Sequence, residues 1–164
     1  MSTDEVRSHP GEREKQVPGI RQQLIGSWTM IDWKVFRGDT TIDPHLGPAD
    51  KCGGFLIYCA DGSMSVTLSV ENRQAFTDGS LDGGTPEEKA HAYETITCYC
   101  GGFDVDEATH EVTHRVRYAT FPNFVGRDLK RECIFEGDAL KLDTPPMLFG
   151  GENLASYILW QRVK

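Results

Sequence analysis

GFLIYCADGSMSVTL, residues 54–68, predicts a β-hairpin whose turn decides which side chains share a face. The pair Asp61-Gly62 favours a two-residue type I′ turn. Side chains alternate between the faces of a strand, so this turn gathers one wholly apolar set: Phe55, Ile57, Cys59, Met64, Val66 and Leu68. The opposite face is more polar and carries Leu56, Tyr58, Ser65 and Thr67. We therefore expect the first set to face the interior.

The rest of the chain repeats this pattern. Its 164 residues suit one domain, and turn residues interrupt segments rich in β-branched and aromatic residues about every 8 to 12 positions. Predicted strands cover residues 26–36, 53–60, 63–70, 95–105, 110–120, 128–136, 139–143 and 154–163. These strands are enough to close an all-β, small antiparallel barrel, which leaves no sheet edge exposed.

One short helix interrupts the strands. Thr85 can cap it, Pro86 suits its first position, and Glu88 completes a capping box. We expect this helix, with the Gly-rich loop 71–84 before it, to cover one barrel end or flank the wall. Residues 1–20 are charged and predicted to be a disordered lead-in, so the barrel domain is expected to span residues 21–164.

The composition of the chain limits the kinds of binding partner that we expect. The formal charge of −8 and the scattered Lys and Arg argue against nucleic acid. No apolar run approaches the roughly 20 residues of a membrane-spanning helix, and the charged N-terminus lacks the apolar core of a secretory signal. We expect a cytoplasmic protein with an apolar small molecule as its partner and no membrane. A homodimer through Leu56 and Tyr58 stays open.

Cysteine and histidine spacing predicts no metal and no cofactor. Five cysteines, an odd number without a CxxC pair, suit free thiols in a reducing compartment. The five histidines form no HxH, and the one HExxH string, HEVTH at residues 110–114, falls in a predicted strand, whereas the zinc-binding motif requires a helix. Phosphate-loop, dinucleotide and GxSxG motifs are also missing from the sequence.

A second hairpin, turning at residues 106–109, brings titratable groups to the interior. Its predicted pairing puts Gly101 opposite His114, which leaves room for a pocket, and gathers these inward side chains: Tyr99, Phe103, His114, Val116 and Tyr118. His114 is interpreted either as a hydrogen-bonded core residue or as a neutral general acid or base. Tyr99 and Tyr118 are interpreted either as packing residues or as groups that hold a substrate oxygen.

A third hairpin, turning at Gly137-Asp138, sets Arg131 and Cys133 on a core face. A buried guanidinium needs a partner, so Arg131 either reaches solvent at the barrel rim, contacts a ligand, or forms a structural salt bridge. Cys133 is interpreted as an inert thiol or as a ligand-lining nucleophile.

Several segments together resemble the bacterial and fungal lipocalin-like domains. The segments are LIGSW (24–28), GFLIYCADGSMS (54–65), GGTPEEKAHAY (83–93), VTHRV (112–116), FPNFVG (121–126), LDTPP (142–146) and ILWQRV (158–163). The resemblance implies an up-and-down barrel with an internal cavity. It also implies that Trp28 packs beside Arg162 of the last strand.

The FPNFVG segment is expected to be a loop whose residues Phe121 and Phe124 either plug the barrel or form an aromatic lip over a ligand entrance, with Trp33 of the first strand contributing.

These residues are compatible with three functions. The first is a cofactor-free enzyme for cyclisation, isomerisation or dehydration of an apolar secondary metabolite, with His114, Tyr99, Arg131 and Tyr118 as catalytic candidates. The second is a carrier or sensor of such a molecule, and the third is a protein-interaction barrel. The sequence narrowly favours the enzyme.

Overall fold

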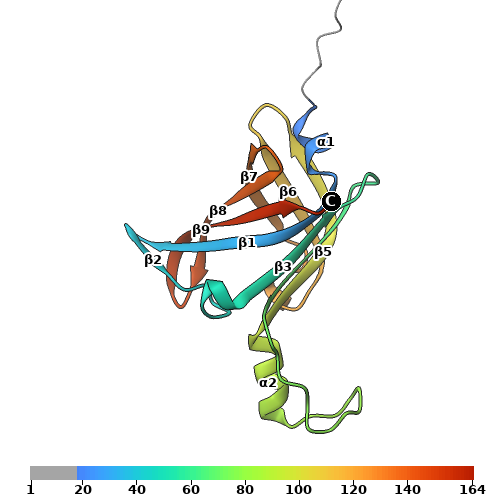
Figure 1. The fold of residues 1–164 in the computed structure, drawn as a ribbon, viewed down its shortest axis with the longest axis vertical. Coiled ribbons are helices and arrows are strands. Elements are labelled where there is room, and N and C mark those ends of the chain that lie inside the picture. Colours follow the sequence, from blue (N-terminus) through green and yellow to red (C-terminus); the bar gives the residue numbers. More distant parts are fainter. Residues whose placement is uncertain (1–17) are drawn as a thin grey trace, which may run out of the picture.

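The computed structural model describes residues 18–164, which form one closed antiparallel β-barrel (Figure 1). Two α-helices and two short 3₁₀ helices accompany the strands: α1 (Ile20–Leu24), η1 (Ala49–Lys51), α2 (Pro86–Glu94) and η2 (Pro122–Phe124). The strands are β1 (Gly26–Arg37), β2 (Thr40–Ile42), β3 (Cys52–Tyr58), β4 (Ser63–Val70), β5 (Ile96–Asp106), β6 (Glu111–Ala119), β7 (Asp128–Glu136), β8 (Ala139–Phe149) and β9 (Glu152–Arg162).

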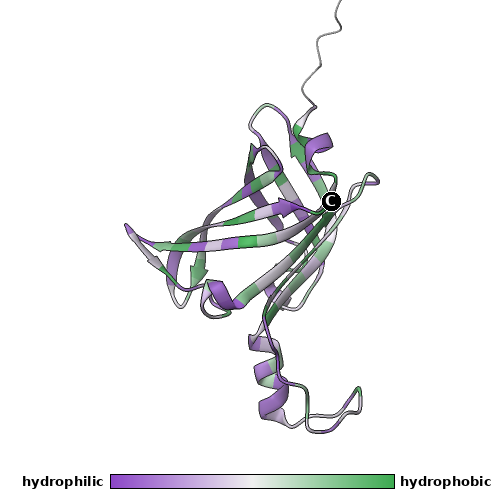
Figure 2. Ribbon diagram, viewed as in Figure 1, coloured by the Kyte–Doolittle hydropathy of each residue, from purple (hydrophilic) through white to green (hydrophobic). Residues whose placement is uncertain are grey.

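Closure of the barrel follows from the pairing of its first and last strands. Neighbouring strands pair in chain order from β3 to β9, and β1 pairs with both β3 and β9. These eight strands form the wall, and the short strand β2 pairs antiparallel with the end of β1. Along these strands hydrophobic and hydrophilic residues alternate (Figure 2). The up-and-down barrel expected from the sequence is confirmed.

Helix α1 closes one end of the barrel. Its residues Ile20 and Leu24 are buried, and the Trp28 indole N–H donates to the Leu24 carbonyl oxygen (2.8 Å). The Arg162 guanidinium lies 4.1 Å from the Trp28 ring and donates to the carbonyl oxygens of Ile25 and Gln23. The pair Trp28 and Arg162 therefore ties this end together. The predicted disordered segment 1–20 lies outside the described residues up to residue 17, and Ile20 belongs to the folded domain.

The first hairpin adopts a register one residue away from the predicted one. Its loop has three residues rather than two: the Cys59 N–H donates to the Ser63 carbonyl oxygen, and Gly62 takes φ +90° at the last loop position. Such a three-residue loop is the next commonest hairpin connection after the two-residue turn. Tyr58 therefore pairs with Met64, and Leu56 with Val66.

This shift exchanges the two faces of β3. Leu56 and Tyr58 are buried inside the barrel, whereas Phe55 is exposed and Ile57 lies on the outer wall with it. The prediction for Phe55 and Ile57 was wrong, and the face expected to suit a homodimer is interior. The predictions that Met64 and Val66 face inward are confirmed, because β4 keeps its inner face.

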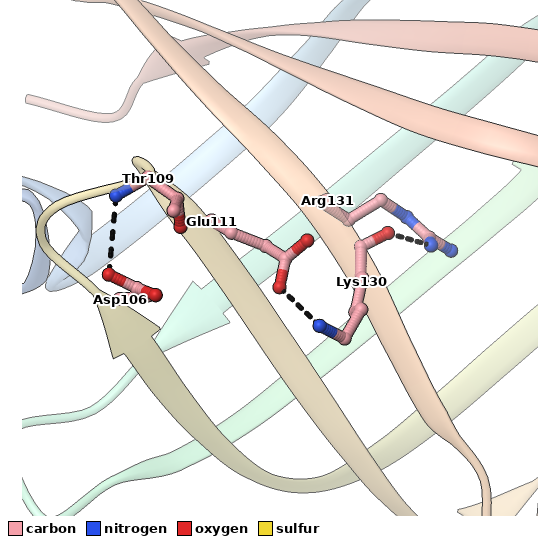
Figure 3. Close-up of polar contacts among 5 residues, drawn as sticks. All are labelled: Asp106, Thr109, Glu111, Lys130 and Arg131. Carbon is pink, nitrogen blue, oxygen red and sulfur yellow. Dashed lines mark hydrogen bonds and ion pairs between the residues drawn. The ribbon is translucent and has the colours of Figure 1, made fainter.

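The second hairpin keeps its predicted faces along β5, but on β6 only near the turn. Asp106 accepts from the Thr109 N–H (3.2 Å; Figure 3), and Phe103, rather than Gly101, stands opposite His114. A bulge then adds an extra residue to β6, where Gly101 pairs with Val116 and Cys100 with Tyr118. A bulge shifts the alternation of side chains. Tyr118 consequently points outward and is 62% exposed, so its predicted interior position was wrong.

The third hairpin and helix α2 match their predicted local structure. Cys133 pairs with Leu142, and both are buried. Thr85 accepts from the Glu88 N–H, and the Glu88 carboxylate accepts from the Thr85 N–H, which completes the capping box. The helix has no buried residue and extends away from the barrel at the end opposite α1 (Figure 1). Its last two residues, Tyr93 and Glu94, line the barrel interior at that end, and the rest of the helix does not cover it, contrary to one of our expectations.

Within residues 18–164, no helix combines the length and apolar character needed to cross a membrane. In the same residues, no three His, Cys, Asp or Glu side chains gather as a metal site. The five cysteines are unpaired; Cys52 and Cys133 are buried, and Cys59 is exposed.

Candidate functional site

A cavity of about 960 Å³ occupies the barrel and opens at the end opposite α1. Drug-sized ligands generally occupy pockets of roughly 300–1,000 Å³. Its walls are mostly apolar and include Leu56, Val66 and Leu68 from the first hairpin, with Leu142 and Ile158 on the far side. The alternation of β3 and β4, with their outward residues in water, leaves these aliphatic side chains facing the lumen. The cavity is therefore a property of the folded barrel.

Aromatic side chains surround the opening. Phe121 and Phe124 of the FPNFVG segment both line the cavity, with their ring centroids 5.1 Å apart in an edge-to-face arrangement. Phe124 also meets the Tyr99 ring edge-to-face at 5.9 Å. Phe121 is partly exposed, whereas Phe124 is half-buried. These two rings form an aromatic lip at the entrance, one of the two alternatives that the sequence left open.

A second aromatic group lies on the other side of the opening. The His45 ring contacts Trp33 edge-to-face (5.4 Å) and stacks on Phe149 (5.6 Å), and its Nε2 lies 3.0 Å from the Thr97 hydroxyl. The His45 side chain is exposed at the opening, but its packing against these rings partly desolvates it and lowers its pKa. An uncharged imidazole here continues the apolar lip of the cavity.

A chain of hydrogen bonds joins Tyr58, His114 and Tyr99 inside the barrel. The Tyr58 hydroxyl lies 2.6 Å from His114 Nε2, and the Tyr99 hydroxyl lies 2.9 Å from His114 Nδ1. Tyr58 and His114 are each only 1% exposed. Tyr99 and His114 line the cavity, whereas Tyr58 lies behind them and does not. The chain therefore runs from the packed interior to the cavity surface.

Burial determines the charge of these three groups. Desolvation lowers the pKa of His114 well below its ordinary value, and the positive charge of Arg131 lowers it further. Desolvation also raises the pKa of Tyr58 and of Tyr99, although Arg131 opposes the rise at Tyr99. At neutral pH the imidazole and both phenols are uncharged. None of them changes its protonation state near pH 7.

Arg131 supplies a positive charge to the cavity wall. Its side chain is half-buried, and its Nη1 donates to the carbonyl oxygen of Lys130 (2.6 Å). Lys130 instead reaches across to the Glu111 carboxylate at 2.7 Å (Figure 3). No carboxylate of residues 18–164 lies within 4 Å of the Arg131 guanidinium. The structural salt bridge considered for Arg131 is thus not formed among the described residues.

Trp160 of β9 contributes an unpaired hydrogen-bond donor. The residue lines the cavity and is 1% exposed. Its indole Nε1 is the one buried side-chain nitrogen or oxygen of residues 18–164 without a hydrogen-bond partner. Such a group is costly to leave unpaired, so this N–H is a candidate contact for a ligand.

The structure separates the predicted site residues into three groups. The first group lines the cavity: Trp33, Val66, Tyr99, His114, Phe121, Phe124 and Arg131. The second group is buried in the barrel but does not line the cavity: Met64, Phe103, Val116 and Cys133. The third group faces outward: Phe55, Ile57 and Tyr118. Burial raises the pKa of Cys133 to about 12, so the inert-thiol interpretation suits it better than a nucleophile.

Three residues of this site were not predicted from the sequence: Tyr58, His45 and Trp160. Tyr58 was assigned to the outer face because the two-residue turn was assumed. His45 lies between predicted strands, where no periodicity indicates a direction. Trp160 stands in the ILWQRV segment, two residues before Arg162. Because side chains alternate between the two faces of a strand, Trp160 shares a face with Arg162, which could have marked it as inward.

Two comparisons with known proteins bear on this site. A model of the lipocalin-like domain family matches residues 25–163. A protein of Aspergillus oryzae named 4'-hydroxy-3'-methoxypropiophenone carrier protein ppsC is 31% identical to this chain over 87 residues, which cover 49% of this chain and 78% of that protein.

Proposed function

Because the chain belongs to the lipocalin-like domain family, we propose that it is a carrier that holds an apolar small molecule inside its barrel. The observation that carries this proposal is the cavity of about 960 Å³ with its mostly aliphatic and aromatic walls. Burial of apolar ligand surface contributes roughly 25 cal/mol per Å², so such walls suffice for affinity. The few polar groups on the walls then set the orientation of the ligand.

The protonation states of the buried groups favour a carrier over the enzyme that the sequence favoured. General acid or base catalysis works best with a pKa near the operating pH. His114 is held neutral and both of its ring nitrogens are engaged by tyrosines. Tyr99 and Cys133 have raised pKa values, which makes them weak acids and leaves little thiolate.

The related Aspergillus protein gives this proposal a ligand class. Its name describes a carrier of an aryl ketone with hydroxy and methoxy groups. A molecule of that size and polarity fits a cavity with an aromatic lip and a few polar wall groups. We propose an aromatic or polyketide-like secondary metabolite for this chain as well, and the cytoplasm as its location.

Catalysis without a cofactor is the second candidate, and the Tyr58, His114 and Tyr99 chain is the observation that favours it. A fixed hydroxyl donor beside a carbonyl stabilises negative charge that develops on its oxygen. An apolar cavity also folds a flexible substrate so that two reacting atoms approach. Tyr99 would then act as the donor, with His114 as a positioning residue.

The decisive experiment follows the fate of the bound molecule. The purified protein is incubated with a small-molecule extract of its source cells, and bound and free compounds are compared by liquid chromatography and mass spectrometry against a heat-denatured control. A carrier returns an enriched compound with unchanged mass and retention time. A compound that is consumed while an isomer or dehydrated product accumulates would replace the carrier by the enzyme.

A pair of variants separates lumen binding from surface binding. Ile158→Glu puts a carboxylate on the cavity wall, where an apolar ligand would strip its water, and should weaken binding at least tenfold. Ile31→Glu makes the same change at an exposed position of β1 and should leave binding unchanged. Circular dichroism verifies that both variants fold. Equal retention of the ligand by both variants would refute binding in the lumen.

A further inference from the structure

We propose that the ligand carries an acceptor oxygen, such as a ketone carbonyl, which receives a hydrogen bond from the Tyr99 hydroxyl, and that Tyr58 sets this direction through His114. The inference rests on the proposed binding of a small molecule in the cavity, and it adds the chemical group that the cavity selects. It follows from counting hydrogens along the three-residue chain.

The count begins at Tyr58. Its hydroxyl is fully buried, and within residues 18–164 its one hydrogen-bond partner is His114 Nε2 at 2.6 Å. A buried hydroxyl that does not donate its hydrogen leaves a polar group unsatisfied, at a cost comparable to a lost hydrogen bond. Tyr58 must therefore donate to Nε2, and Nε2 must be the nitrogen without a hydrogen.

The hydrogen of the neutral imidazole consequently sits on Nδ1. A neutral histidine carries one N–H and one acceptor nitrogen, and desolvation disfavours the doubly protonated form here. Nδ1 lies 2.9 Å from the Tyr99 hydroxyl oxygen, so His114 donates to Tyr99. The oxygen of Tyr99 acts as the acceptor in this contact.

Tyr99 then retains a hydrogen of its own. It cannot donate that hydrogen to Nδ1, which already bears one, and no other acceptor of the described residues lies in hydrogen-bond contact with its hydroxyl. Tyr99 lines the cavity, whereas Tyr58 does not. The unused hydrogen is therefore available to a molecule in the cavity.

One further wall group offers a hydrogen without an acceptor, and a second one carries a positive charge. The buried Trp160 indole N–H has no partner, and the Arg131 guanidinium has no carboxylate partner within residues 18–164. Both groups line the cavity. The cavity wall thus holds a second buried donor besides Tyr99, which matches a ligand with acceptor oxygens.

The first test reads the His114 tautomer directly. Nitrogen-15 chemical shifts of the imidazole in the full chain at pH 7 distinguish a protonated from an unprotonated ring nitrogen. We expect the protonated shift at Nδ1 and the unprotonated shift at Nε2. A proton on Nε2 would overturn the inference, because Tyr99 would then have to donate to Nδ1.

The second test compares two probes of nearly equal shape, 4-acetylbiphenyl and 4-ethylbiphenyl, which differ in the carbonyl oxygen. Their affinities are measured by displacement of the neutral fluorescent dye N-phenyl-1-naphthylamine. Tyr99→Phe should weaken binding of the ketone about five- to tenfold and leave binding of the hydrocarbon within twofold, as expected for one hydrogen bond. Tyr118→Phe removes the same hydroxyl from the outer wall and should change neither affinity.

The ratio of the two affinities separates the possible failures. An equal effect of Tyr99→Phe on both probes, or no effect on either, would overturn the acceptor-oxygen inference while leaving the carrier intact. Failure of the unmodified protein to bind the dye and either probe would instead count against the proposed carrier. Because the ratio cancels general changes in the cavity, slight destabilisation of Tyr99→Phe does not obscure the result.

Discussion

Replacement of His114 by phenylalanine should destabilise the barrel mainly through the tyrosine that it leaves behind. The substitution removes the contacts with Tyr58 and Tyr99. Loss of the Tyr99 contact should cost about 1 kcal/mol, since that hydroxyl can still turn toward the cavity. Tyr58 is fully buried and would keep an unsatisfied hydroxyl, at about 2 kcal/mol. We expect a total loss of about 3 kcal/mol in the free energy of unfolding.

A second substitution tests how the loss of stability divides between Tyr58 and Tyr99. Removing both partners of a buried hydrogen bond is much less costly than removing one. The double variant Tyr58→Phe, His114→Phe should therefore be more stable than His114→Phe alone, by roughly 1 to 2 kcal/mol. Urea unfolding followed by tryptophan fluorescence gives the four free energies of the cycle. The control Tyr118→Phe should stay within about 0.5 kcal/mol of the unmodified protein, because its side chain is exposed.

Additive effects would refute this reasoning. If the double variant loses as much stability as the sum of the two single variants, within about 0.5 kcal/mol, the two side chains do not interact as the structure shows. The 2.6 Å contact between Tyr58 and His114 would then carry no energetic weight.

Three further predictions concern the pH dependence of stability, a glycine in close contact with the neighbouring backbone, and the reactivity of the cysteine thiols. Because the pKa of His114 is lowered in the folded state, the unfolded chain binds the extra proton as pH falls below about 6.5. The free energy of unfolding should therefore be full above that pH and fall by up to about 1.4 kcal/mol per pH unit below it. In His114→Phe this pH dependence should be absent from urea titrations made at each pH. Gly101→Ala should lower the melting temperature, because an added Cβ would lie 2.0 Å from a carbonyl oxygen, whereas Gly53→Ala, with no atom within 4 Å, provides the control in calorimetry. Cys133 should resist a thiol reagent until the protein unfolds, whereas the exposed Cys59 should react at once, and equal labelling of both by peptide mass spectrometry would contradict the burial of Cys133.

Much of the fold could be predicted because its signals are local. Strand segments were recognisable from β-branched residues between turns, and the capping box of α2 lies within four consecutive residues, Thr85 to Glu88. Trp28 and Arg162 came from the family resemblance, and the structure brings them together at the end closed by α1. Helix α1 and strand β2 were missed, because five and three residues are too short to show a period.

The candidate site was predictable only in part. His114, Tyr99 and Arg131 reach the cavity as expected, since β5, β7 and the part of β6 before its bulge keep their predicted faces. Phe55 and Tyr118 were misplaced by one extra residue each, in the first loop and in the β6 bulge. An extra residue reverses every later side chain of a strand, and the sequence Asp-Gly suits a loop of either length.

The sequence by itself determined an antiparallel barrel, the inward residues of β4 and the capped helix, because each depends on residue type and short spacing. Only the tertiary structure decided that Tyr58 meets His114. These residues lie on β3 and β6, which are separated by β4 and β5 in the sheet and meet only because the sheet curls into a closed barrel. Curvature, strand register and loop length together set that contact across the lumen, and no local pattern encodes their sum.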